Sequence, residues 1–175
     1  MDNIKRIIFN LTEIELAGIA KLGDDKYLDY LVDSWSYLAR MEVAKHKKDK
    51  YLDKLRYDKD FYVLREVAKH GRPQDLDVLI NVRDFRILRD VAKHGRPQDL
   101  DVIMSFTKNN LIMIEDEMSG YHEDWVVLYR IDKVTYADVL REVAKHGRPQ
   151  DLEKIKNSPY GAKIFKEDGT IKYGR

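Results

Sequence analysis

The stretch LREVAKHGRPQDL occupies residues 64–76 and returns unchanged at residues 140–152. Between the two, residues 88–100 read LRDVAKHGRPQDL. A catalytic site needs its residues once, so the same residues at several separate places favour one structural unit that is copied and stacked.

The alanine of VAKH measures the repeat. Ala44, Ala68 and Ala92 are 24 residues apart, and the segment IAKLG places Ala20 one period earlier. The next marker, Ala144, follows Ala92 by 52 residues, which is two periods plus four. The spacing therefore predicts one degenerate, enlarged copy in this interval.

Each copy is predicted to form two short helices. The first carries one apolar stripe (Val63, Leu64, Val67, Ala68). Gly71 then suits a helix end that needs positive φ, and Pro73 suits the first turn of a new helix. The second helix has Asp75 in its first turn, where exposed amides favour an acid, and buries three residues (Leu76, Leu79, Ile80). Helices this short are unstable alone, so stacking of the copies must stabilise them.

The 24-residue period is too short for tetratricopeptide, ankyrin, HEAT or armadillo units, and the strand signature of ordinary leucine-rich repeats is absent. The copy VLREVAKHGRPQDLDVLINVRDFR, residues 63–86, resembles the leucine-rich repeat variant family, whose short helical repeats are HEAT-like. The resemblance covers about residues 12–156 and implies alternating α- and 3₁₀-helices in a right-handed superhelix. The founding type also carries a cysteine-ligated iron–sulfur cluster, which a chain without cysteine does not inherit.

The composition fits a folded, highly charged chain. Of 175 residues, 43% are hydrophobic and 36% are charged, and the net charge of +1 gives no global field that would gather nucleic acid or an anionic membrane. The absence of cysteine excludes disulfides and thiolate-held metals. No apolar stretch approaches the ~18 residues of a membrane span, so we expect a cytoplasmic protein without membrane contact.

Four histidines at the repeat spacing resemble metal ligands at first (His46, His70, His94, His146). Equivalent side chains on units stacked about 8–10 Å apart do not converge on one ion. We therefore interpret each histidine as a helix-ending residue at the negative pole of its helix. No metal and no cofactor is expected.

A second ladder is basic and consists of seven residues (Lys45, Lys69, Arg72, Lys93, Arg96, Lys145, Arg148). It could follow a nucleic-acid backbone. Acidic residues accompany it, because residues 62–105 hold eight basic and seven acidic side chains. A mutually neutralised surface is the preferred interpretation, and nucleic-acid binding is the alternative.

The pattern breaks at residues 111–138, where acids and aromatic residues replace the GRPQDL turn. Such a mixture is typical of a protein-binding patch, which we assign to eight residues (Glu115, Asp116, Glu117, Tyr121, His122, Glu123, Asp124, Trp125). The alternative is that Trp125 fills the core of an enlarged copy. No nucleophile and no second histidine at ligand spacing accompanies His122, so no enzyme is expected.

The sequence thus predicts a single all-α solenoid of about six 24-residue repeats, acting as a non-catalytic scaffold for a protein partner. Residues 12–110 are regular copies, 111–138 the enlarged copy and 139–157 the last copy. Thr12 and Glu15 form a capping box, and residues 1–11 are predicted to be a helical cap over the open end (Ile4, Ile7, Ile8, Leu11). Residues 158–175 are a β-hairpin with its turn at Asp168 and Gly169, or a tail.

Overall fold

The computed structural model describes residues 3–8, 10–106 and 135–172. Within these ranges the chain is all-helical, with twelve α-helices. The contacts divide it into two compact units, residues 1–79 and residues 80–175, and each is described by itself. No helix in the described ranges is long and apolar enough to cross a membrane.

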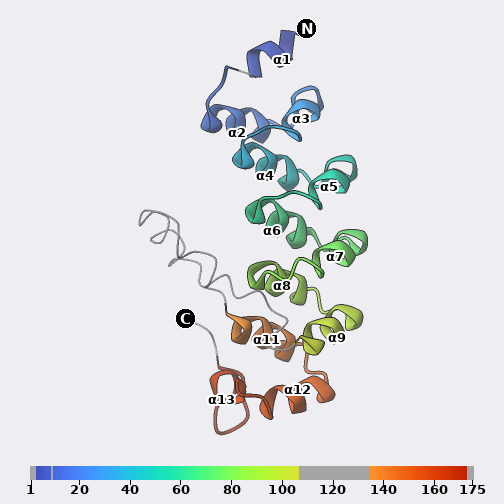
Figure 1. Cartoon of the computed structure of the whole chain (residues 1–175), viewed down its shortest axis with the longest axis vertical. Helices are drawn as coiled ribbons and strands as arrows, with labels where there is room; N and C mark the ends of the chain where they lie inside the picture. The colour runs from blue at the N-terminus through green and yellow to red at the C-terminus, as the bar shows by residue number, and fades with distance from the viewer. Residues whose placement is uncertain (1–2, 9, 107–134, 173–175) are drawn as a thin grey trace. The chain divides into compact units, whose positions relative to one another are not determined.

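Unit 1 is built from helix pairs (Figure 1). After α1, the first helices of the pairs (α2, α4, α6) pack on one another in order, and the second helices (α3, α5, α7) lie in a second row beside them. The bounds are α1 Asn3–Ile8, α2 Glu13–Lys21, α3 Asp25–Leu31, α4 Tyr37–Lys45, α5 Asp49–Leu55, α6 Phe61–His70 and α7 Pro73–Leu79.

The local signals in the sequence set these helix ends. Gly71 ends α6 with φ of 69°, and Pro73 begins α7, as predicted. The predicted capping box at the start of α2 is confirmed: Thr12 N donates to Glu15 Oε2 at 2.8 Å, and Glu15 N donates to Thr12 Oγ1 at 3.4 Å. The second helices are α-helices, whereas the family resemblance implied 3₁₀-helices.

The core of unit 1 is the predicted one. Val63, Val67 and Ala68 are fully buried and Leu64 is 6% exposed. In α7, Leu76 and Leu79 are fully buried; Ile80, with which unit 2 begins, is 6% exposed. Equivalent apolar residues are buried in the other helix pairs, so each short helix gains its stability from its neighbours. The predicted cap behaves differently: α1 forms, but Ile7 is 60% exposed.

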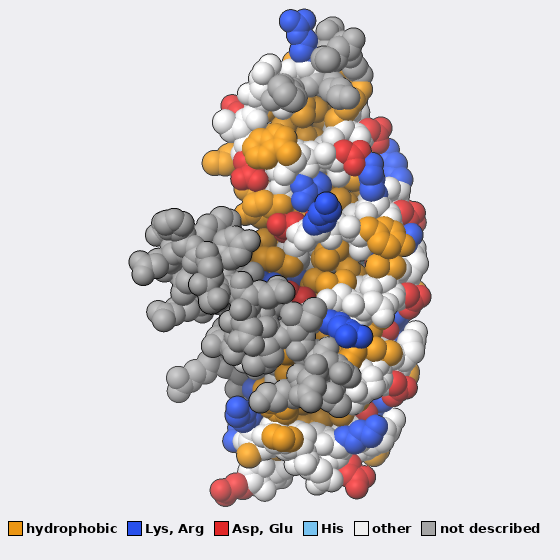
Figure 2. All heavy atoms as spheres, viewed as in Figure 1, with side chains coloured by type: hydrophobic (Ala, Val, Ile, Leu, Met, Phe, Trp, Pro, Cys, Tyr) orange, Lys and Arg blue, Asp and Glu red, His pale blue; other side chains and the backbone are white. Residues whose placement is uncertain are grey.

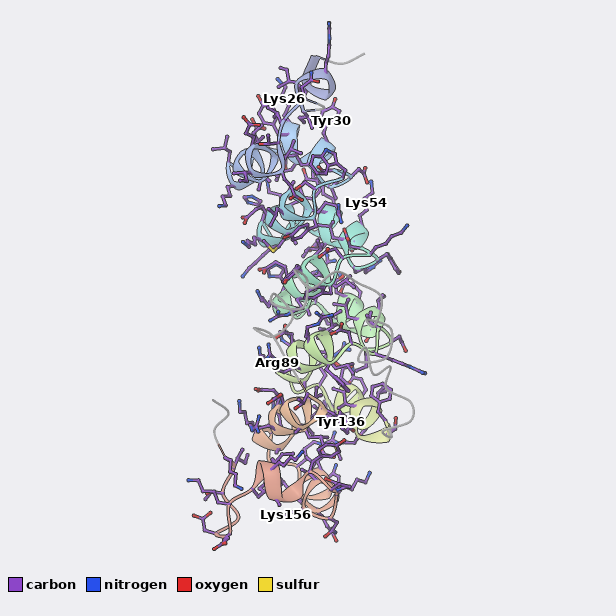
Figure 3. The ribbon with its side chains drawn as sticks, turned by 60° about the vertical axis from the view of Figure 1, so that its left-hand side comes forward. Lys26, Tyr30, Lys54, Arg89, Tyr136 and Lys156 are labelled. Carbon is purple, nitrogen blue, oxygen red and sulfur yellow. The ribbon has the colours of Figure 1, made fainter. Side chains whose placement is uncertain are left out.

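Unit 2 repeats the arrangement with α8 Phe85–Ala92, α9 Pro97–Ser105, α11 Tyr136–Lys145, α12 Pro149–Lys156 and α13 Gly161–Ile164. Helix α8 packs on α9 and α11, and α11 also packs on α12 and α13. Tyr136, labelled in Figure 3, joins these helices: its hydroxyl donates to the Ile103 carbonyl at 3.1 Å, and its ring lies 5.9 Å from that of Phe85.

The direct contact between α8 and α11 bears on the predicted enlarged copy. Residues 111–134 of that copy lie outside the described residues, and Thr135 to Asp138 form the capping box and first turn of α11. The imidazole of His146 binds the carbonyl of Ala92, 54 residues earlier, whereas the same contact spans 26 residues in unit 1. Helices α8 and α11 are therefore neighbours of the usual kind, although 28 extra residues separate them in sequence.

The predicted C-terminal β-hairpin is absent from the described residues, and this prediction was wrong. Residues 161–164 form α13, and a single antiparallel bridge joins Phe165 to Ile171, with the turn at Gly169 (φ 80°). The predicted pairing of Lys166 with Ile171 is thus shifted by one residue, and Tyr173 lies outside the described residues. The reason is burial: Ile164 and Phe165 are consecutive and both buried, which a strand with alternating faces does not allow.

Candidate functional site

The protein-binding patch predicted from the sequence lies wholly outside the described residues (Glu115, Asp116, Glu117, Tyr121, His122, Glu123, Asp124, Trp125). That assignment stays a prediction. The described residues do place the repeated histidines, the basic ladder and a pair of exposed aromatic residues.

The histidines contact the preceding copy. Nε2 of His46 lies 2.7 Å from the carbonyl oxygen of Ala20, and Nε2 of His70 lies 2.8 Å from that of Ala44. The accepting carbonyl is one of the last in the preceding first helix, and it also accepts a backbone hydrogen bond of 3.1 Å from the residue three positions on, Gly23 N for Ala20 and Lys47 N for Ala44. Each histidine therefore sits at the negative pole of the neighbouring helix, as well as at the end of its own, and fixes the register of the two copies.

A glycine makes room for the rings of His46 and His146, whereas Lys47, also at positive φ, stands at the equivalent position before His70. A Cβ atom added to Gly23 would lie 2.8 Å from Cε1 of His46, and one added to Gly95 would lie 2.5 Å from Cε1 of His146. Gly95 also has φ of 66°. The glycine of GRPQDL thus serves both the helix end and the docking of the next copy.

The arginine of GRPQDL also joins neighbouring copies. Arg72 donates two hydrogen bonds of 2.7 Å to the fully buried carboxylate of Asp75, and it reaches Asp49 and Asp53 of α5, both at 2.9 Å. In unit 2, Arg148 pairs with Asp151 and reaches the carbonyl of Pro97 and the carboxylate of Asp101 in α9. These carboxylates raise the pKa of Arg72 further above its usual value.

Every lysine of the basic ladder is paired with an acid three residues before it. The distances between the ammonium and carboxylate groups are 2.7 Å for Lys45, 2.7 Å for Lys69, 2.5 Å for Lys93 and 2.8 Å for Lys145. The acids are largely buried, and the lysine side chains are 42–51% exposed. Each of these lysines is therefore part of an ion pair at the end of its own first helix. Among the described residues, no group of three or more metal-ligating side chains comes together.

Acids and bases are also interspersed over the second helices of unit 1, along the right-hand edge in Figure 2. Lys50 pairs with Asp29 at 2.8 Å, and Lys54 pairs with Asp33 at 2.5 Å, so α5 is bound to α3 by opposite charges. Burial raises the pKa of the Tyr51 hydroxyl, which donates to Asp29, to about 12. These charges hold neighbouring copies together.

Two exposed aromatic side chains stand apart from this pattern. Trp35 lies in the loop between α3 and α4 and is 67% exposed, and Tyr57 lies in the loop between α5 and α6 and is 66% exposed. Single exposed apolar side chains are common on protein surfaces, whereas two large aromatic rings on loops that share contacts make a candidate binding patch. Tyr57 lines an open hollow of about 340 Å³, together with residues of both loops and of helices α4 and α5 (Val32, Asp33, Ser34, Arg40, Lys54, Leu55, Asp58, Lys59).

Arg40 fixes the two loops relative to each other. Its guanidinium donates to both oxygens of Asp58, at 2.6 and 3.0 Å, and to the carbonyl oxygens of Ser34 and Trp35, at 2.6 and 3.1 Å. The Arg40 and Asp58 side chains are only 16% and 7% exposed. A largely buried, bidentate ion pair is a firm link, so both aromatic residues are presented on a preformed surface.

Sequence reasoning missed this surface, although the repeat carries a signal for it. Trp35 falls at the position of Lys59 and Arg83 in the next two copies, and Tyr57 falls at that of Asp33 and Asn81. A large aromatic residue at a position that is otherwise polar, in a loop between helices, predicts an exposed ring.

Comparison with known proteins does not relate the chain to a known family. No family model, no curated protein and no solved structure matches the chain.

Proposed function

We propose that this chain is a non-catalytic helical-repeat scaffold, a right-handed solenoid of about six copies of the leucine-rich repeat variant kind, that binds another protein. The observation that carries the proposal is the pair of exposed aromatic residues, Trp35 and Tyr57, on two loops that Arg40 holds together.

Rigid presentation matters because a binding site that is already ordered loses little conformational entropy on association. Tyrosine and tryptophan dominate the energetics of protein interfaces, since they bury much apolar area at a small entropic cost. The hollow beside Tyr57 offers room for a side chain of the partner. Lys54 and Lys59 at its edge, with Asp33 and Asp58, provide a polar rim.

The ladder of ion pairs counts against the alternative of nucleic-acid binding. A lysine that binds a phosphate must give up its carboxylate partner or share it, and the partner then remains as a negative charge beside the phosphate. Lys69 and Glu66 illustrate the arrangement, because the carboxylate lies 2.7 Å from the ammonium and is only 12% exposed.

The test is capture of a partner by the purified, tagged chain, in nuclease-treated extract, compared with the Trp35→Ala/Tyr57→Ala double variant. Val82→Ala/Val102→Ala is a matched control, since both valines are 37% exposed and lie away from the two loops in sequence. We expect a protein that the parent and the control retain and that the aromatic variant loses, with helical circular dichroism unchanged in all three. Equal capture by the aromatic variant, or capture of nucleic acid that is lost at high salt, would overturn the proposal.

A further inference from the structure

The hollow beside Tyr57 departs from the repeat at its base. At the position of Arg40, the first helices of the other copies carry a buried leucine (Leu16, Leu64, Leu88, Leu140). At the position of Asp58, the neighbouring copies carry Ser34 and Val82. The copy formed by α4 and α5 has therefore exchanged a core leucine for an arginine, and the carboxylate of an aspartate binds that arginine.

This exchange is not explained by stability. The Arg40 and Asp58 side chains are 16% and 7% exposed, so both charges have been taken largely out of water. The attraction within such a pair does little more than offset the lost hydration, and an apolar residue at the same position is often as stable or more stable. A sequence that breaks its own pattern in this way is expected to do so at a functional site.

The charges that line the hollow do not cancel. Three of the lining side chains are cations and two are carboxylates. Asp58 neutralises Arg40, and the carboxylate of Asp33 lies 2.5 Å from the ammonium of Lys54. Lys59 is exposed and forms no hydrogen bond or ion pair with a described residue. One positive charge at the hollow is therefore available to a ligand.

The hollow also keeps hydrogen-bond donors for that ligand. A guanidinium has five N–H groups, and the bonds of Arg40 to Asp58 and to the carbonyls of residues 34 and 35 use at most four of them. The hydroxyl of Tyr57, which lines the same hollow, forms no hydrogen bond with a described residue. A donor held in place by an ion pair, beside a lysine and a tyrosine hydroxyl, suits an oxyanion.

We propose that the hollow binds a carboxylate of the partner, which docks through an acidic segment in which an aspartate or glutamate stands beside an apolar residue. This inference rests on the proposed function, because it assigns the group that the same surface recognises. The carboxylate meets Lys59 and the remaining N–H of Arg40, and the apolar neighbour packs on the ring of Tyr57.

The charge balance favours a carboxylate over a phosphate. The lining side chains carry a net charge of +1, which one carboxylate neutralises. A phosphate group carries close to two negative charges at neutral pH. Its second charge would stand unbalanced beside Asp33 and Asp58, where like charges repel.

Selection from a library of random peptides displayed on phage, with the full chain immobilised, tests the inference. We expect the selected peptides to share an acid next to an apolar residue and to be lost with Trp35→Ala/Tyr57→Ala. A synthetic peptide of the selected sequence then gives dissociation constants by fluorescence anisotropy. Lys59→Glu should raise the constant about tenfold, and Lys59→Arg should preserve it. Lys26→Glu is the matched control, at an exposed lysine of α3 that does not line the hollow.

Two further comparisons test the base of the hollow and the sign of the ligand. Arg40→Leu/Asp58→Val gives this copy the residues of the next one, Leu64 and Val82. We expect it to unfold at the same urea concentration as the parent chain, or a higher one, and to bind the peptide about tenfold less tightly. A peptide with lysine in place of its acid should bind Lys59→Glu more tightly than the parent chain, because the charges are then exchanged.

The outcomes distinguish this inference from the proposed function. Selected peptides that need Trp35 and Tyr57 but have no acid, or whose affinity is indifferent to Lys59→Glu, would refute the carboxylate site and leave the protein-binding surface in place. A selection without any peptide that depends on the two aromatic residues would refute both. A fluorescent single-stranded oligonucleotide that binds the parent chain but not Lys59→Glu would assign the hollow to phosphate, and the inference would again be wrong.

Discussion

The buried carboxylate of Asp75 gives the sharpest test of how the copies are held together. Arg72 binds three acids, of which Asp75 is fully buried and Asp49 is 79% exposed. Replacing Asp75 with asparagine keeps the size of the side chain but removes its charge, and it turns one of the two acceptor oxygens toward Arg72 into a donor. One charge-assisted hydrogen bond of about 1.5–3 kcal/mol is lost, and a guanidinium N–H then faces an amide N–H.

We therefore expect Asp75→Asn to lower the free energy of unfolding by about 2–3 kcal/mol, measured by urea denaturation followed by circular dichroism. Asp49→Asn is the matched control, because it removes an acid from the same arginine at an exposed position, where ion pairs contribute little. Its effect should fall within the error of the measurement. Equal effects of the two substitutions, or no effect of Asp75→Asn, would refute the conclusion that the arginine and aspartate of GRPQDL hold neighbouring copies together.

Three further outcomes are expected. Burial lowers the pKa of the His70 imidazole, so as the pH falls the unfolded state takes up a proton before the folded state does. The free energy of unfolding should therefore fall as the pH drops below about 6.5. In urea titrations at a series of pH values, His70→Gln should lack this decrease. Burial raises the pKa of Tyr51 to about 12, so the folded state holds this proton more tightly than the unfolded state. The free energy of unfolding should therefore fall between about pH 10 and 12, and Tyr51→Phe should lack this decrease in the same titrations. Arg40→Lys should speed amide hydrogen exchange in residues 33–36 and 56–60 and leave α2 unchanged, because lysine cannot bind both oxygens of Asp58 and two carbonyls at once.

The helices and their junctions could be predicted because each depends on a local signal. A glycine followed two residues later by a proline, as at Gly71 and Pro73, marks the end of one helix and the start of the next. The apolar residues of α6 recur with the period of a helix and not with that of a strand. The partners of polar residues could not be predicted, because they lie in another copy. Asp75 looked like a solvated first-turn acid and is fully buried, and His70 has its acceptor 26 residues away.

The remaining discrepancies have the same cause. The hairpin was predicted from alternation around Asp168 and Gly169, but contacts with α12 and α11 favour a helix over residues 161–164. Trp35 was overlooked because its signal is a departure from the repeat at one loop position, and the contact with Arg40 that fixes the loop cannot be read from the sequence. The direct contact of α11 with α8 could not be predicted, because spacing along the chain does not say which helices are neighbours in space.

The central claim is that the copies stack through fixed contacts, with α11 docked on α8 as one copy docks on the next. Deletion of residues 107–134 tests it most directly, because removing 28 residues restores the 24-residue period between Ala92 and Ala144. We predict that the shortened chain keeps its helical circular dichroism and cooperative unfolding, and that nuclear Overhauser effects still join the His146 ring to Gly95. A shortened chain that unfolds, or that loses the contact between His146 and Gly95, would contradict the account.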